Sequence, residues 1–556
     1  MPTIEVSLEE LSDLVGVRLS VSELEELLLR TKASLEEVEG EMVVLEVTAD
    51  RLDLLSVEGL SRAIKGLLGV ETGAPRYEVR SSGVVLTVDR SVGPVRPYIM
   101  GAVVKGVRLS PGAIASLMQA QEKLHATIGR DRRRVAIGIH DFSKVEPPLV
   151  YRAEPAREVT FVPLHEERAM TAEEILRSTE KGVRYRHLLG DGSVVPVIRD
   201  RRGEVLSMPP IINSDLTKVT EESRDLFIDM TGTDLRSISL CMKILCADLA
   251  ERGGRIESVR VIYPEFELES PDMSPQVVEA DLSFIESIVG EEIGEDEVIS
   301  LLRAGRIDAR LEGERVIATV PAYRHDFLHP VDLAEEVAVL LGYHRLEPVM
   351  PVNVMTVGKA HPIERLSRKV RVIMVGLGYQ EVANYIMTSE EVLFYTLGNG
   401  PRDVVRVGNP VSASYEVLRD TLLPGLIWFI ARNPGAPLPH KVFEVGDVVI
   451  PDPEAETLAR DERRIGAAIS DVEVGFEDIQ SHLFALGRQL GLEFELEKRE
   501  APGFLRGRCA GVRLEGEEVG IVGEISPEVL EKVKIRNPVA VFEISLTRLG
   551  EKLGWL

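Results

Sequence analysis

The chain has 556 residues, of which 44% are hydrophobic and 28% are charged, and its mean hydropathy is +0.03. At about 150 residues per domain, this length predicts roughly four domains, each able to bury its own core. The 91 acidic residues outnumber the 65 basic ones and leave a net charge of −26. This charge excludes a general nucleic-acid coat, because phosphate binding requires a positive potential.

Cysteine usage and the N-terminal sequence indicate the compartment. Cys241, Cys246 and Cys509 form no CxxC pair and have no histidine at zinc-ligand spacing. We therefore expect neither a disulfide framework nor a structural zinc, and we expect a reducing cytoplasm. The start, MPTIEVSLEELSDLVGV, lacks the basic residues and apolar core of a signal peptide. No apolar run approaches the about 20 residues that a membrane span needs.

Residues 1–75 predict a mixed α/β module. A strand followed by a helix is expected early in the module, where Ser7 is the candidate N-cap and Glu10 would complete a capping box. The same start signal recurs at Ser20 or Ser22. Glycine and proline in GVETGAPRYE then mark the first domain boundary.

Residues 80–265 alternate short β-branched runs with helical stretches and predict an α+β domain. Within it, the stretch QEKLHATIGRDRRRVAIGIHDFSKV places His140 at a strand end, after a basic run from Arg130 to Arg134. In so acidic a chain, this run could meet an RNA phosphate backbone. On charge alone, a solvated turn explains it slightly better.

Small polar residues gather around two prolines later in this domain. They are Ser207, Asn213, Ser214, Thr217, Thr220, Asp229, Thr231 and Thr233. Such groups can line a pocket for an amino acid and position a water, but turn chemistry explains them without a ligand. A serine nucleophile is not indicated, because no GxSxG elbow is present and neither Ser207 nor Ser214 has a recognisable base nearby in sequence.

The remaining chain predicts two further units. Residues 271–348 favour a small domain in which 274–290 and 294–308 are helical and a hairpin turns at Gly313. Residues 355–556 favour antiparallel strands with helices packed on one face. Because there is no GxxxxGK[ST] loop and no GxGxxG opening a helix, no nucleotide site is indicated.

The segment RHDFLHPVDLAEE contains four acids, Asp326, Asp332, Glu335 and Glu336. Pro330 suits a first helical turn, so the helix is expected to begin at His329 or Pro330. Asp332 and the two glutamates then share one face, and converging carboxylates suit Mg²⁺. Acids in a first turn are also stabilised by the helix dipole, and Arg324 or Arg345 could neutralise them. Spacing alone favours a solvated helix start.

Several stretches, taken together and in order, resemble one family, the beta subunit of phenylalanine–tRNA ligase in its archaeal and eukaryotic form. They are residues 121–145, 208–234, 320–346, 409–426 with 441–449, and 507–530. The resemblance implies a tetramer of two alpha and two beta chains that charges tRNA with phenylalanine using ATP. The alpha subunit would be the partner that carries this active site and binds ATP and phenylalanine.

The resemblance also implies a class II synthetase-like fold for residues 355–556, in a degenerate form. The strand KVFEVGDVV occupies the place of the arginine-bearing ATP motif, but the Arg–x–Glu is missing. No glycine-rich segment ending in arginine follows. Because guanidinium groups bind the phosphates of ATP, we interpret this unit as an assembly scaffold without a second active site.

In the family, the central domain hydrolyses tyrosine that is wrongly attached to the tRNA. His140 lies where the family's pocket has a histidine, and further candidates for the lining are Ser207, Asn213, Ser214, Asp229, Thr231 and Asp234. A polar pocket would reject phenylalanine, because its polar groups would be left unpaired.

The four acids match the family's magnesium-binding pattern at every position, which makes Mg²⁺ the favoured interpretation. We expect the ion to brace a domain or subunit contact rather than drive chemistry. The bacterial RNA-binding insertion and anticodon-binding domain have no counterpart, so the alpha chain is expected to do more of the tRNA binding. The competing hypothesis is a non-catalytic RNA-binding or assembly protein built from the same domains.

Overall fold

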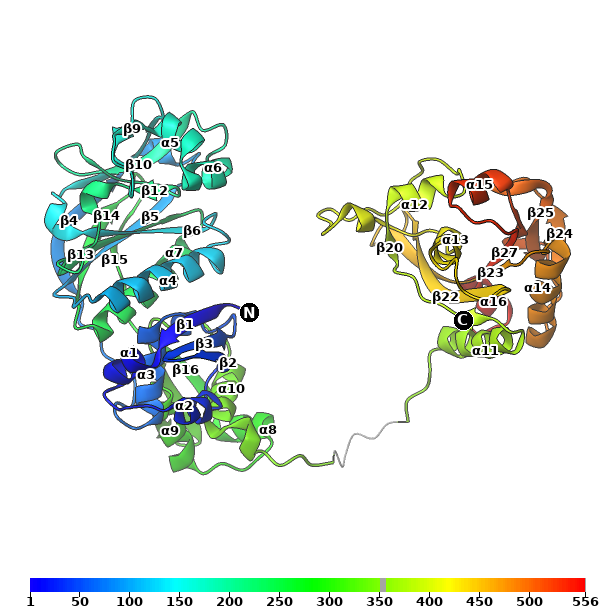
Figure 1. The fold of residues 1–556 in the computed structure, drawn as a ribbon. Helices are drawn as coiled ribbons and strands as arrows, with labels where there is room; N and C mark the ends of the chain where they lie inside the picture. Colours follow the sequence, from blue (N-terminus) through cyan, green and yellow to red (C-terminus); the bar gives the residue numbers. More distant parts are fainter. Residues whose placement is uncertain (351–356, 556) are drawn as a thin grey trace. The chain divides into compact units, whose positions relative to one another are not determined.

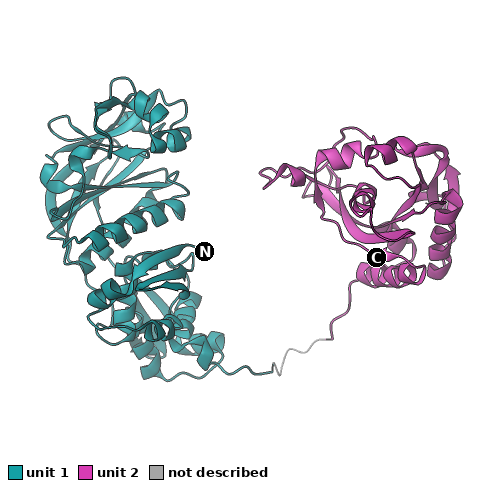
Figure 2. Cartoon of the chain, viewed as in Figure 1, with its two compact units in different colours: residues 1–350 teal, residues 351–556 magenta. Residues whose placement is uncertain are grey.

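The computed structural model describes residues 1–350 and 357–555, which fall into two compact units, residues 1–350 and 351–556 (Figures 1 and 2). Among the described residues, no helix is long and apolar enough to cross a membrane.

A three-stranded antiparallel sheet with the order β1-β3-β2 begins the first unit. Its elements are β1 (Thr3–Ser7), α1 (Leu8–Val15), α2 (Val21–Leu28), β2 (Ala33–Glu39), β3 (Met42–Val47) and α3 (Val57–Leu67). The Ser7 side chain accepts a hydrogen bond from the amide of Glu10, which confirms Ser7 as the N-cap, but the expected capping box is not formed, because the Glu10 carboxylate accepts from Arg252 instead. A complete capping box is present at the second start, where Ser20 pairs with Glu23.

A ten-stranded mixed sheet follows, with the order β12-β11-β10-β7-β4-β14-β5-β13-β6 and β15 added to β14. Its strands are β4 (Arg80–Val88), β5 (Tyr98–Lys105), β6 (Val135–Asp141), β7 (Leu149–Pro155), β10 (Val194–Arg199), β11 (Val205–Met208), β12 (Ile212–Asn213), β13 (Asp225–Gly232), β14 (Arg255–Ile262) and β15 (Glu267–Ser270). Strand β4 runs parallel to β7 and β14, and the other neighbours are antiparallel.

Two long helices, α4 (Pro111–Ala126) and α7 (Leu235–Glu251), lie against this sheet (Figure 1). They share one buried cluster with the first module, which joins Leu11 and Leu45 to Leu117, Ile228 and Leu245. Two short helices, α5 (Ala172–Ser178) and α6 (Glu180–Tyr185), lie near the β10 end of the sheet (Figure 1). A β-ribbon of β8 (Thr160–Phe161) and β9 (Met170–Thr171) precedes them.

The last part of the first unit is a three-stranded antiparallel sheet with the order β16-β18-β17. Its elements are β16 (Gln276–Asp281), α8 (Leu282–Val289), α9 (Glu295–Ala304), β17 (Asp308–Glu312), β18 (Arg315–Val320) and α10 (Pro330–Leu341). The hairpin turns at Gly313, as expected, in a left-handed conformation (φ +65°). The helix expected over 274–290 is wrong in its first half, because these residues pair with β18 as a strand.

The second unit holds a seven-stranded sheet with the order β19-β22-β23-β27-β26-β25-β24. Its strands are β19 (Gln380–Glu381), β22 (His440–Pro451), β23 (Ala459–Ser470), β24 (Glu495–Lys498), β25 (Phe504–Leu514), β26 (Glu517–Ile525) and β27 (Val539–Ser545), with a separate ribbon of β20 (Met387–Thr388) and β21 (Val417–Leu418). All neighbours in the sheet are antiparallel except β19 and β22.

Helices cover both faces of this sheet, which corrects the expectation of one covered face. The helices of this unit are α11 (Pro362–Gly376), α12 (Glu390–Tyr395), α13 (Leu423–Arg432), α14 (Phe476–Leu490), α15 (Pro527–Lys532) and α16 (Leu546–Lys552). Phe443 packs in the cluster of α11, α14 and α16, whereas its neighbour Val442 packs in that of α13 and α15. Successive strand residues point to opposite faces, so the run Val442–Phe443 requires apolar cover on both.

Candidate functional site

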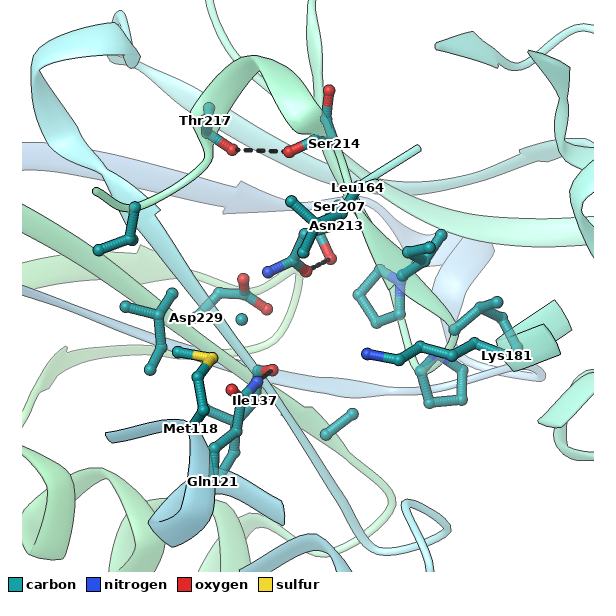
Figure 3. Close-up of a pocket in the computed structure, with 18 of the residues that line it drawn as sticks. Met118, Gln121, Ile137, Leu164, Lys181, Ser207, Asn213, Ser214, Thr217 and Asp229 are labelled. Atoms are coloured by element: carbon teal, nitrogen blue, oxygen red, sulfur yellow. Dashed lines mark hydrogen bonds between the residues drawn. The ribbon is translucent and has the colours of Figure 1, made fainter. Parts of the chain in front are cut away.

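A cavity of about 400 Å³ opens in the first unit between helix α4, strands β6 and β13, the turn after β11 and helix α6 (Figure 3). Most of its wall is apolar. The apolar lining includes Ile114, Met118, Ile137, Ile139, Leu164, Pro209, Pro210 and Ile211. A cavity of this kind with a few polar groups is typical of a small-molecule site.

Asp229 is one of the two acidic groups that line the cavity, and His140 fixes its carboxylate from the side away from the cavity. His140 Nε2 lies 2.8 Å from Asp229 Oδ2, and His140 Nδ1 lies 2.7 Å from Thr217 Oγ1. With Nε2–H donating to the carboxylate, Nδ1 accepts from the threonine hydroxyl. Asp229 and Thr217 line the cavity, whereas His140 is fully buried and lies outside the lining. The histidine therefore acts on the cavity through Asp229.

Gly138 makes this pair possible, and the sequence analysis missed it. It sits on β6 directly opposite Asp229 on β13. A Cβ atom at Gly138 would lie 2.0 Å from Asp229 Oδ2 and 2.9 Å from His140 Nε2. Any side chain would thus displace the carboxylate. The signal was the glycine inside the apolar strand RVAIGIH, since glycine in a strand marks a close approach.

Ser207, Asn213 and Ser214 line the cavity as expected, but they differ in what they offer it. Ser207 Oγ donates to Asn213 Oδ1 at 3.0 Å, which turns the amide nitrogen of Asn213 towards the cavity (Figure 3). The Ser214 hydroxyl accepts from the amide of Leu216 and caps a 3₁₀ turn at Asp215–Thr217. Turn chemistry therefore accounts for Ser214, whereas Asn213 has a donor left for a ligand.

The structure does not bring Thr231 and Asp234 into this lining. Thr231 Oγ1 accepts a hydrogen bond from Nε of the buried Arg96 at 2.8 Å. Asp234 is the N-cap of α7 and accepts from the amide of Ser237. Both side chains stabilise the backbone at the end of β13, so they support the site without contacting the cavity.

The far end of the cavity carries charged residues that the sequence analysis did not select, Glu122 on α4, Arg132 in the following loop and Lys181 on α6. Arg132 belongs to the basic run and is only 5% exposed. Its guanidinium donates to Glu122 Oε1 at 2.7 Å and to the carbonyl oxygens of Pro210 and Ile211. The solvated-turn interpretation is therefore wrong for this arginine, although Arg130 and Arg133 are exposed.

Positive charge dominates this end. The nearby His125, whose Nδ1 lies 3.5 Å from Glu122 Oε1, and the charge of Arg132 lower the pKa of Glu122 to about 2, so this carboxyl is ionised at neutral pH. Burial, together with the charge of Arg132, lowers the pKa of Lys181 below its ordinary value. One carboxylate thus faces two cations here, while the opposite end carries the carboxylate of Asp229.

Arg324 pairs with two of the four acids of the segment 324–336. Its guanidinium donates to Asp326 Oδ1 and Oδ2 at 2.9 and 2.7 Å, and to Glu336 Oε1 and Oε2 at 3.0 and 2.7 Å. Burial alone would raise the pKa of Asp326, but Arg324 holds it well below its usual range. Both carboxylates are therefore already neutralised within the protein.

The other two acids point to different partners. Asp332 accepts from the amides of Leu328 and His329 and so caps its own helix. Glu335 is about half exposed and pairs with Lys32 at 3.0 Å. Within residues 1–350 and 357–555, no three His, Cys, Asp or Glu side chains are grouped to hold a metal ion. The four acids fit Mg²⁺ by donor type, but as arranged they do not fit it as a converging ligand set.

The C-terminal sheet also buries charged side chains, and these are paired with each other. Arg464 donates to Glu462 at 2.8 Å and to Glu543 at 2.7 Å. Glu543 also accepts from the amide of Leu422 at the start of α13. Arg419 donates to the buried Glu444 at 2.6 Å. These arginines have internal carboxylate partners, so none of them presents a free guanidinium to a phosphate group.

Known proteins match almost the whole chain. Three family profiles match, "Phenylalanyl tRNA synthetase beta chain CLM domain" at residues 346–546, "tRNA synthetase B5 domain" at 278–343 and "B3/4 domain" at 100–256. The phenylalanine–tRNA ligase beta subunit of Korarchaeum cryptofilum is 50% identical over 99% of this chain and 100% of its own length. That of Pyrococcus abyssi is 40% identical at the same coverage. An N-terminal fragment of the phenylalanyl-tRNA synthetase beta subunit from Pyrococcus horikoshii superposes with a TM-score of 0.60 and 41% identity, over 62% of this chain and all of the fragment.

Proposed function

Because this chain belongs to the family of phenylalanine–tRNA ligase beta subunits, we propose that it works as the beta subunit of that enzyme beside an alpha subunit. The complex charges tRNA with phenylalanine using ATP, and the alpha subunit carries the charging site. The assembly is a tetramer of two alpha and two beta chains. Its place is the cytoplasm, in keeping with the three unpaired, buried cysteines.

The cavity on the central sheet is the editing site of this subunit, where tyrosine wrongly attached to the tRNA is removed. It lies within the region that matches the B3/4 profile. The observation that carries this proposal is the buried carboxylate of Asp229, fixed by His140 at the end of an apolar cavity. Tyrosine differs from phenylalanine only by the phenol hydroxyl, and this carboxylate accepts its hydrogen bond. Phenylalanine would leave the buried acceptor unpaired, which disfavours its binding.

The reaction is hydrolysis of the ester between tyrosine and the terminal ribose. The oxygen of a water molecule adds to the ester carbonyl carbon, and the bond from that carbon to the ribose oxygen breaks. The ribose oxygen takes up a proton, and the products are tyrosine with a free carboxylate and tRNA with its hydroxyl restored. In this reaction Asp229 and Asn213 bind and orient the substrate, and His140 is a positioning residue that keeps Asp229 in place.

Residues 355–556 form a class II synthetase-like scaffold without an active site of its own. This proposal is supported by the internal pairing of Arg464 and Arg419 with buried glutamates. A phosphate-binding arginine must be free to make a bidentate contact with its ligand. The four-part division of the chain, at 1–75, 80–265, 271–348 and 355–556, stays a prediction that is supported by the four sheets of three or more strands.

Magnesium binding at Asp326, Asp332, Glu335 and Glu336 is a separate proposal. It rests on the four oxygen donors in one short segment. The ion would brace this segment, and Arg324 would have to release Asp326 and Glu336 for all four acids to bind it. The Glu335→Gln variant tests the site, because Glu335 is exposed.

The measurement is Mn²⁺ binding to the complex by electron paramagnetic resonance, with Mn²⁺ as the probe for Mg²⁺. We expect the Glu335→Gln variant to bind Mn²⁺ at least about tenfold more weakly, because even the loss of a group that only supports a metal ligand has an effect of this size. Glu312→Gln, which is exposed on the same small sheet, is the matched control. Unchanged Mn²⁺ binding in Glu335→Gln would contradict the proposal.

The subunit assignment is tested by purifying this chain alone and together with its alpha partner. We expect the complex, but not the isolated chain, to charge tRNA with phenylalanine. We also expect the complex to deacylate tyrosyl-tRNA faster than phenylalanyl-tRNA. Failure of the complex to charge overturns the assignment, and charging by the isolated chain overturns the scaffold proposal. Absence of deacylation would instead favour the alternative of a non-catalytic binding module.

A further inference from the structure

A carboxylate and an ammonium group lie at the two ends of the editing cavity, and the exposed Lys218 also belongs to its lining. Asp229 lies at the end formed by β13, and Lys181 reaches into the cavity from helix α6 on the other side (Figure 3). Between them the wall is largely apolar. A ligand that spans the cavity must therefore offer a hydrogen-bond donor at one end and a negatively charged oxygen at the other.

Lys181 has no partner of its own in the part of the chain that the structure describes. No hydrogen bond or ion pair to its Nζ is present among residues 1–350 and 357–555. Burial and the nearby Arg132 both disfavour its charged form. A lysine that is partly buried without an acceptor destabilises the fold, unless a ligand supplies the acceptor.

The neighbouring Arg132 is held rigidly and cannot take over this role. Arg130, Asp131 and Arg132 all have left-handed backbone conformations, with φ of +47°, +52° and +65°. This unfavourable turn directs the arginine inwards, where its terminal nitrogens are used by Glu122 and by two backbone carbonyl oxygens. Its buried Nε has no partner among the described residues. Arg132 thus adds fixed positive charge, while Lys181 is the cation whose head group has no protein partner among the described residues.

We propose that Lys181 binds a negatively charged oxygen of the aminoacyl-tRNA 3′ end while Asp229 binds the phenol hydroxyl. The proposal rests on the editing function proposed above. Tyrosyl-tRNA has the matching polarity, with a phenol donor at one end and anionic oxygens at the other. The cavity thereby binds both ends of its substrate. Free tyrosine lacks the tRNA phosphates that could bind Lys181.

The charged oxygen has two sources within the same substrate. A phosphate of the terminal nucleotides is anionic throughout the reaction. If Lys181 binds this phosphate, removing Lys181 weakens substrate binding and raises KM. The ester carbonyl oxygen becomes negative only as water adds to its carbon, so the loss of its partner lowers kcat. The split between KM and kcat therefore identifies the source, and both sources fit the proposal.

The experiment measures deacylation of tyrosyl-tRNA by the complete complex with its alpha subunit. We expect Lys181→Met to lower kcat/KM about 100-fold, as expected for the loss of a charged contact to the substrate. Lys181→Arg keeps the charge and retains much of the activity. The matched control is Arg177→Met, which removes one positive charge from the adjacent helix α5, where Arg177 is exposed and paired with Glu173. This control deacylates like the wild type.

Charging of tRNA with phenylalanine by the same preparations shows that each variant complex is assembled. If Lys181→Met deacylates like the wild type, or if Arg177→Met is impaired to the same extent, the role of Lys181 is overturned. If the wild-type complex itself does not deacylate tyrosyl-tRNA, the editing proposal has failed instead. The wild-type rate therefore separates failure of this inference from failure of the function on which it rests.

Discussion

Two regions of this molecule bury charged side chains at the centres of strands, and they use them differently. In the central sheet, one carboxylate oxygen of Asp229 on β13 is hydrogen-bonded to His140, and Asp229 lines a cavity. In the C-terminal sheet, Glu543 on β27 is equally buried, but Arg464 and the start of α13 take up its carboxylate. The first carboxylate can accept a hydrogen bond from a ligand, whereas the second is satisfied within the fold.

The difference shows that burial of charge does not by itself mark a functional site. A buried carboxylate with a complete set of protein partners fixes the packing of the elements around it. A buried carboxylate that is only partly satisfied, beside a cavity, retains binding capacity for a substrate. We therefore expect substitutions in the two sheets to separate loss of function from loss of stability.

The largest effect is expected at Asp229. Replacing it by asparagine keeps the shape but removes the charged acceptor for the phenol hydroxyl. We expect deacylation of tyrosyl-tRNA to fall about 1,000-fold in kcat/KM, with charging by the complex unchanged. The control is Asp225→Asn on the same strand, outside the cavity lining. Deacylation at the wild-type rate in Asp229→Asn would contradict the assignment of this carboxylate to the substrate.

The opposite behaviour is expected in the C-terminal sheet. Substitution of Glu543 by alanine removes one buried carboxylate partner of Arg464. It also leaves the backbone amide of Leu422, at the start of α13, without its hydrogen-bond acceptor. We expect the second unit to lose about 3 kcal/mol of stability, while deacylation is unchanged in the assembled complex. Thermal unfolding with tryptophan fluorescence measures the effect, since Trp428 and Trp555 both lie in this unit.

Glu518→Gln is the matched control on the same sheet, because the pair of Glu518 with Arg499 is exposed. We expect it to change stability by about 0.5 kcal/mol or less. Equal losses of stability in Glu543→Ala and Glu518→Gln would contradict the view that the buried ion pair contributes more to stability than the exposed one.

A smaller effect is expected at His140, because it reaches the substrate only through Asp229. We expect His140→Asn to lower deacylation about tenfold, the usual effect of losing a residue that orients a ligand-binding group. Combined with Asp229→Asn, it should cause no further loss, since both substitutions remove the same interaction. A full additional loss in the double variant would show that His140 contacts the substrate by itself.

Much of the fold follows from local sequence signals. Ser7 and Ser20 predicted helix starts, Gly313 predicted a hairpin, and Pro330 predicted the start of α10, because each signal depends only on neighbouring residues. The strand β16 was missed, because its pairing with β18 is a contact between distant segments. The second helical layer on the C-terminal sheet was missed for the same reason.

The site was predicted in part. Ser207, Asn213 and Asp229, which the sequence analysis selected, line the cavity, and His140, selected through the family resemblance, lies behind Asp229. Glu122, Arg132 and Lys181 lie on other elements, and only the fold of the loop and of α6 brings them to the far end. Gly138 had a visible sequence signal, a glycine inside an apolar strand. A charged residue on a helix has no such signal, because most such residues are solvated.

Asp326 and Glu336 are paired with a buried arginine, as Glu543 is in the C-terminal sheet and as Asp229 in the cavity is not. This pairing predicts how the stability of the first unit depends on pH. Arg324 keeps the pKa of Asp326 below the value of about 4 that aspartate has when unfolded. The pair therefore stabilises the first unit above pH about 4, and its contribution is lost as the pH falls below that value. We expect Asp326→Asn to cost about 2 kcal/mol at pH 7, and we expect this cost to shrink progressively as the pH falls from about 4 towards the lowered pKa of Asp326. Unfolding midpoints of both proteins across this range measure the difference, and a constant difference would contradict an ionised Asp326 as the partner of Arg324.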